Sequence, residues 1–172
     1  VLFRSLAPKG AFPKVDNNSI TCYTTNMEIK LLDKSKERNA LMEGIVTFYA
    51  SQLKIDNHRF ILHVGTASGM AKDSAMAGMV MKLQDREYVL LIDRKLQLHQ
   101  MLIVLAHEMT HIKQYVRGQL RPHVSRRGVT SYTWMGRKFK NDNYESPWEI
   151  EAYSRERVLA NRLTRVLEKK FG

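Results

Sequence analysis

Two histidines and a glutamate lie at a spacing that can hold a metal ion and activate a water molecule. His107, Glu108 and His111 form the pattern His-Glu-x-x-His. In a helix, residues four apart lie one turn apart on the same face, so both imidazoles can reach one zinc ion. Glu108 would lie beside the ion without binding it, where it can take a proton from a zinc-bound water. The pattern therefore predicts a zinc site that supports hydrolysis.

The alternative interpretation is that the two histidines are ordinary core residues with satisfied hydrogen bonds. On an apolar helix, however, a glutamate without a partner beside two histidines would be costly to bury without a metal ion. The three fixed positions would match by accident in roughly one chain of this length in a few hundred. We therefore favour the metal site.

A catalytic zinc site usually has three protein ligands, so a third must come from elsewhere in the chain. Cys22 is the only cysteine, which leaves a carboxylate as the expected ligand. Glu149 and Glu151 both lie near the start of a helical pattern that follows Ser146. We prefer Glu149. Because Ser146 and Glu149 also match a capping box, Glu149 could serve only the helix end, and Glu151 would then be the ligand.

Further side chains could assist the reaction. A developing oxyanion needs a second donor besides the metal ion. The available candidates downstream of the motif are Tyr132, Tyr144, Tyr153 and His123. The sequence does not choose among them, and each is more often a packing aromatic or a surface residue. Gln114, about one turn beyond His111, is expected to orient the backbone or the histidine rather than to contact substrate.

These residues need elements that bring two helices together. Hydrophobic periodicity predicts a first helix from an N-cap at Asp33 to about Leu53, strands at 60–64 and 79–83, and a buried central strand at 88–92. The helix with the motif follows and stops near Gly118, and a last helix runs from Ser146 and Pro147 to about Lys170. We expect an α+β fold with a small mixed sheet of about three strands. Residues 119–145 are expected to form an irregular insertion, in which a hairpin is one option.

The chain of 172 residues is long enough for one ordinary core and too short for two well-buried domains. Residues 1–30 contain few periodic apolar positions and are expected to be an N-terminal arm or loop, followed by one domain at 31–172. No apolar run approaches the ~18 residues that span a bilayer, so no membrane partner is expected. With a single cysteine, a reducing, cytoplasmic setting is expected. The oligomeric state is left open.

Two segments together resemble minimal gluzincins, a class of zinc metallopeptidases. The segments are HEMTHIKQ at 107–114 and PWEIEA at 147–152, and the resemblance is closest to SprT-like and to phage or metagenomic metallopeptidases. It extends over roughly residues 40–170. The resemblance implies a zincin-like fold, a protein or peptide substrate, Glu108 as the general base, and His107, His111 and Glu149 as ligands of Zn²⁺.

The resemblance also bears on the choice between the two carboxylates. In gluzincins, the distal glutamate is commonly followed three positions later by alanine, and Glu149 with Ala152 fits this rule, whereas Glu151 with Ser154 does not. Many gluzincins have an aspartate four positions after that glutamate, where it supports a zinc-bound histidine. This chain has Tyr153 there, so that support is in doubt.

The charge of the chain favours acidic partners. The formal net charge is +11, with a pI of about 9.9. A basic cluster in the insertion at 117–140 comprises Arg117, Arg121, Arg126, Arg127, Arg137, Lys138 and Lys140. Tyr132 and Trp134 are interleaved with it, and cations beside aromatics also grip single-stranded nucleic acid. A solvated loop is the alternative. Because SprT-like proteases include enzymes that digest proteins crosslinked to DNA, the resemblance permits a nucleic-acid-linked substrate.

The sequence thus predicts zinc-dependent hydrolysis of peptide bonds. One alternative is a DNA-associated protein with a structural or vestigial zinc site. The presence of Glu108 argues against it, because a structural site needs the two histidines and not the base. Another alternative is a metal-dependent hydrolase of a non-peptide bond, since the same activated water can attack other electrophiles.

Overall fold

The computed structural model describes residues 26–70, 77–125, 130–140 and 145–171. The elements used below are β1 (Met27–Leu31), α1 (Lys36–Gln52), β2 (Phe60–Ala67), β3 (Gly78–Gln84), β4 (Glu87–Asp93), α3 (Leu98–Val116), β5 (Leu120–Val124), β6 (Thr130–Trp134), β7 (Arg137–Phe139) and α4 (Pro147–Phe171). The predicted α+β class is confirmed. No helix in the described ranges is long and apolar enough to cross a membrane.

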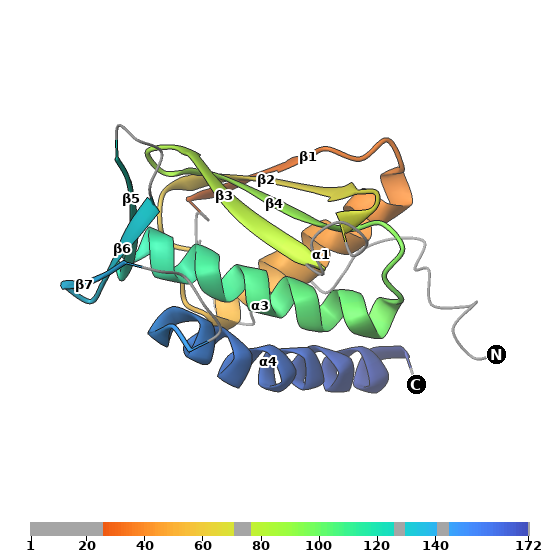
Figure 1. Cartoon of the computed structure of the whole chain (residues 1–172). Coiled ribbons are helices and arrows are strands. Elements are labelled where there is room, and N and C mark those ends of the chain that lie inside the picture. Colours follow the sequence, from red (N-terminus) through yellow and green to blue (C-terminus); the bar gives the residue numbers. More distant parts are fainter. Residues whose placement is uncertain (1–25, 71–76, 126–129, 141–144, 172) are drawn as a thin grey trace.

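A four-stranded mixed sheet forms one layer of the fold. Its strand order is β1-β2-β4-β3, with β1, β2 and β4 parallel and β3 antiparallel at one edge. As predicted, β4 is central. Figure 1 shows α3 lying against this sheet and α4 on the far side of α3. The helix with the His-Glu-x-x-His pattern is therefore the middle layer.

The core explains why α3 keeps one position. Leu105, Met109 and Ile112 of α3 are fully buried, as are Leu90 of β4 and Leu163 of α4. Each large apolar side chain buried in this way contributes about 1.5–3 kcal/mol relative to exposure. The helix ends where predicted, because Gly118 has φ +65°, a left-handed conformation that glycine adopts readily. Packing on both sides thus fixes the helix that carries the site.

Two N-terminal features differ from the sequence prediction. Residues 27–30, placed in the arm, belong to strand β1, which pairs with β2 and adds a fourth strand to the sheet. Residues 1–25 lie outside the described residues. The N-cap of α1 is Ser35, whose hydroxyl accepts from the Arg38 N–H at 3.3 Å, and not Asp33. Asp33 instead accepts a hydrogen bond from the Thr66 hydroxyl at 2.8 Å.

The described part of the insertion is regular, which agrees with the hairpin option and not with an irregular segment. Strands β5, β6 and β7 form a three-stranded antiparallel sheet. The rings of Tyr132, Trp134 and Phe139 all pack around Trp148 at the start of α4. Arg121 and Lys138 flank Thr133 in register on the opposite face, because paired residues on neighbouring strands share a face.

In its described part the predicted cluster is thus divided between the two faces of the small sheet, although Arg137 pairs in register with Trp134 and shares the aromatic face. The rings of Tyr132 and Trp134 pack against Trp148. The cations Arg121 and Lys138 lie on the other face of the small sheet. Arg126 and Arg127 of the predicted cluster lie outside the described residues.

Candidate metal centre

Three ligand groups from two helices meet at one point. His107 Nε2 lies 3.3 Å from one oxygen of Glu149, and His111 Nε2 lies 3.2 Å from the other. The two Nε2 atoms are 3.1 Å apart. The histidines come from α3 and Glu149 from the first turn of α4. The structure thus brings together the three residues named as ligands from the sequence.

The spacing of these atoms fits the edges of a zinc tetrahedron. Ligands at 2.0–2.1 Å from a tetrahedral zinc ion are separated by about 3.3 Å. The two imidazole nitrogens are 3.1 Å apart, close to that value, and each lies 3.2–3.3 Å from a different oxygen of Glu149, so one small ion could contact both rings and the carboxylate. Two imidazole lone pairs at 3.1 Å also repel unless a proton or a cation lies between them. The donor set is therefore suited to zinc.

The Nδ1 atom of each histidine, on the far side of the ring from Glu149, contacts a second side chain. His107 Nδ1 lies 3.0 Å from a carboxylate oxygen of Glu156, and His111 Nδ1 lies 2.9 Å from the side-chain oxygen of Gln114. If each Nδ1 carries the proton, each Nε2 presents a lone pair to the centre. The orienting role predicted for Gln114 is seen in this contact.

Glu156 was missed in the sequence. Many gluzincins have an aspartate at the position of Tyr153 to support a zinc-bound histidine. In this chain Glu156, about one turn further along α4, contacts His107 Nδ1 instead. The signal was available, since Glu156 lies seven residues after Glu149 and so on the same helical face. The ring of Tyr153 packs on His107 instead, with ring centroids 4.7 Å apart.

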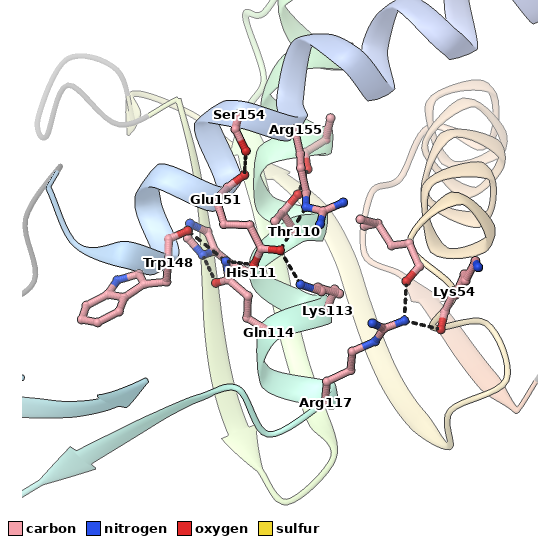
Figure 2. A network of polar contacts seen from close by, with 12 residues as sticks. Lys54, Thr110, His111, Lys113, Gln114, Arg117, Trp148, Glu151, Ser154 and Arg155 are labelled. Carbon is pink, nitrogen blue, oxygen red and sulfur yellow. Dashed lines mark hydrogen bonds and ion pairs between the residues drawn. The ribbon is translucent and has the colours of Figure 1, made fainter. Parts of the chain in front are cut away.

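A buried polar network fixes the orientation of the Gln114 amide, as Figure 2 shows. Its nitrogen donates to the Trp148 carbonyl at 2.9 Å and to Glu151 at 3.1 Å. The other Glu151 oxygen accepts from Lys113 at 2.5 Å, and this lysine is only 4% exposed. With its nitrogen facing two acceptors, the amide must turn its oxygen to His111.

Glu151 is therefore separate from the ligand cluster. Its two oxygens are taken by Lys113, Gln114 and Arg155 on the α3 and α4 surfaces behind the site. Burial alone would raise its pKa, but hydrogen bonds from Lys113 and Gln114 keep the pKa below its usual range. Of the two carboxylates proposed from the sequence, the geometry places Glu149 with the histidines.

Electrostatics keep the Glu149 carboxylate ionised. Burial would raise its pKa, but hydrogen bonds from His107 and His111 outweigh this and lower the pKa to about 2. Burial would lower the pKa of both histidines, and the same hydrogen bonds to Glu149 raise it instead. The protonation states of the three groups are therefore coupled.

Glu108 is a buried carboxylate close to β3. It is 7% exposed, and a Cβ added at Gly78 would lie 2.8 Å from its Oε1. Burial raises its pKa, while the charges of His111 and His107 lower it. A raised pKa suits a group that must accept and then release a proton near neutral pH. The glycine at 78 allows the edge strand to approach this carboxylate.

The candidate oxyanion donors occupy different places. The Tyr153 ring is beside His107 and the side chain is 45% exposed. Tyr132 packs on Trp148, and His123 contacts the Thr133 hydroxyl at 2.8 Å on the small sheet. Tyr144 lies outside the described residues. Of the three that are described, Tyr153 has its ring against a proposed metal ligand.

Comparison with known proteins leaves the site to be interpreted from its own geometry. No family model, no curated protein and no solved structure matches this chain.

Proposed function

We propose that this chain is a zinc-dependent hydrolase that cleaves peptide bonds in a protein or peptide substrate. The observation that carries the proposal is the convergence of two imidazole nitrogens, 3.1 Å apart, with a carboxylate whose oxygens lie 3.2–3.3 Å from them, while a second side chain orients each imidazole. A core histidine pair with no ligand has no need of that arrangement. A cytoplasmic setting, expected from the single cysteine, belongs to the same proposal.

The residues around the centre divide the work of hydrolysis. Bound zinc supplies a Lewis acid that acidifies water and polarises a carbonyl oxygen. His107, His111 and Glu149 would hold the ion, and as three protein ligands they would leave room for a water molecule. Glu108 accepts the proton from water and delivers it to the leaving amine, for which its raised pKa is suited. A purely structural site would have no use for this base.

The edge strand β3 supports an extended peptide as substrate. One side of β3 pairs with β4, and no described strand pairs with its other side. An extended peptide can add to such an edge through backbone hydrogen bonds. Gly78, at the start of β3, lies against Glu108. A peptide on this edge would therefore pass the proposed base.

The proposal is tested by separating metal binding from proton transfer. Glu108→Gln preserves size and removes the base, so it should retain zinc and lower kcat for quenched fluorescent casein by roughly a hundredfold or more. Glu43→Gln on the exposed face of α1 is the matched control and should cleave like the parent.

Two outcomes would contradict the proposal. Cleavage by Glu108→Gln at the parent rate would remove Glu108 from the mechanism. Zinc-loaded parent protein that cleaves no peptide substrate would favour the alternatives, a structural or vestigial site or hydrolysis of a non-peptide bond.

A further inference from the structure

A second pocket lies away from the metal centre. It has a volume of about 410 Å³ and is enclosed by the β3–β4 turn, the last turn of α3 and strand β5. Pockets of this size fit one small molecule or one unit of a polymer. The proposed hydrolysis uses none of its residues.

The floor of the pocket is aromatic and apolar. Tyr115 is half-buried and stacks on the buried Tyr88, with ring centroids 5.9 Å apart and planes inclined by 17°. Leu120 and Pro122 of β5 complete this side. Such a surface can accept a flat ring, because every aromatic or heteroaromatic ring has a face that stacks.

The mouth of the pocket is cationic. Three of its exposed residues, Lys82, Arg86 and Arg121, are positively charged, and Asp85 is the one carboxylate in the lining. Asp85 lies 3.7 Å from Lys82, which leaves the two arginines without an acidic partner among the described residues. Arg86 donates to the Arg59 carbonyl at 3.1 Å, a contact that positions the guanidinium and does not neutralise it.

We propose that this pocket binds one nucleotide of a single-stranded nucleic acid. The base would lie over Tyr115, and the phosphates would meet Arg86 and Arg121, whose planar guanidinium groups suit phosphate oxygens. An acidic peptide would use the cationic mouth and leave the aromatic floor uncovered. A base in a duplex is stacked and paired, so it cannot enter.

A strand fits better than a free nucleotide because the positive charge continues beyond the pocket. Arg121 at the mouth shares the outer face of the small sheet with Lys138, two strands away and in register through Thr133. Neighbouring phosphates of a bound strand would follow this face. Contact with several phosphates makes the affinity fall steeply with added salt.

The test measures binding of a labelled ten-nucleotide oligothymidylate to the full chain by fluorescence anisotropy at low salt. Arg121→Glu and Arg86→Glu should each weaken binding by about tenfold or more. Tyr115→Leu keeps an apolar floor without a stacking ring and should weaken it by about fivefold or more. The matched charge control is Lys36→Glu, at the exposed start of α1, which should change affinity less than about twofold.

Competitors distinguish the pocket from a generally basic surface. A duplex of equal length and a polyglutamate peptide should compete at least about tenfold more weakly than the single strand, and thymidine monophosphate more weakly still. Equal losses in Lys36→Glu and Arg121→Glu, equal competition by any of the three ligands, or no binding by a folded parent would overturn the proposal. Because no cleavage is measured, failure here is independent of the hydrolase proposal.

Discussion

At the scale of single residues, the main feature is that both histidines are aimed by partners outside the metal cluster. The Gln114 amide has one orientation because two acceptors, Trp148 and Glu151, face its nitrogen. Glu156 does the same for His107 with a carboxylate oxygen at 3.0 Å. Such partners set which ring nitrogen is free to bind metal, and their loss typically weakens metal affinity by about 10–100-fold.

Two substitutions at Glu156 test this orienting role. In Glu156→Gln, an amide oxygen can still accept from His107 Nδ1, so the zinc dissociation constant should change by less than about threefold. In Glu156→Leu that acceptor is gone, and the constant should rise by about tenfold or more. Competition with a chromophoric chelator measures both values. Equal zinc affinities in the two variants would show that Glu156 does not orient His107.

At the scale of elements, the site depends on how α4 packs against α3. The nearly buried Lys113 of α3 and Glu151 of α4 form an ion pair two residues from each of the ligands His111 and Glu149. Burial lowers the pKa of Lys113, and its hydrogen bond to Glu151 opposes this. The pair therefore joins the helices without entering the metal cluster.

Removing the cation should weaken the fold more than the metal site. Lys113→Met leaves Glu151 with Arg155 and Gln114, so the free energy of unfolding should fall by about 2 kcal/mol. Zinc affinity should change little, since the Gln114 contacts persist. Chemical denaturation measures the first quantity, with the exposed Lys169→Met as control. Unchanged stability would show that the pair contributes nothing.

The sequence predicted the elements with strong periodicity and missed those formed by long-range pairing. The apolar stripe of α3 and the spacing of its motif are local signals, and Leu105, Met109 and Ile112 are buried as expected. Strand β1 has only 5 residues and pairs with β2, which follows α1 in the chain, so its identity depends on a strand that is distant in sequence. The contact of Glu156 with His107 spans 49 positions along the chain, and only the packing of α4 on α3 creates it.

At the scale of the whole molecule, a metal ion that joins two helices should stabilise the native state. The unfolded chain cannot hold all three ligands together, so zinc at a hundred times its dissociation constant adds about 2.7 kcal/mol. For a chain of this size that corresponds to a rise of roughly 5–10 °C in Tm. Calorimetry with zinc and with chelator should show this rise for the parent. The same rise in His107→Ala would place the stabilising zinc elsewhere.

The most direct test of the account is the zinc stoichiometry and affinity of the parent beside two isosteric variants on one helix. The parent should bind one zinc per chain, since three convergent ligands form one site. Glu149→Gln should weaken zinc binding by about tenfold or more, because it removes a charged ligand. Glu151→Gln keeps an oxygen that can accept from Gln114 and should stay within about threefold of the parent. A parent that binds no zinc, or a loss of zinc in Glu151→Gln alone, would contradict the metal centre described here.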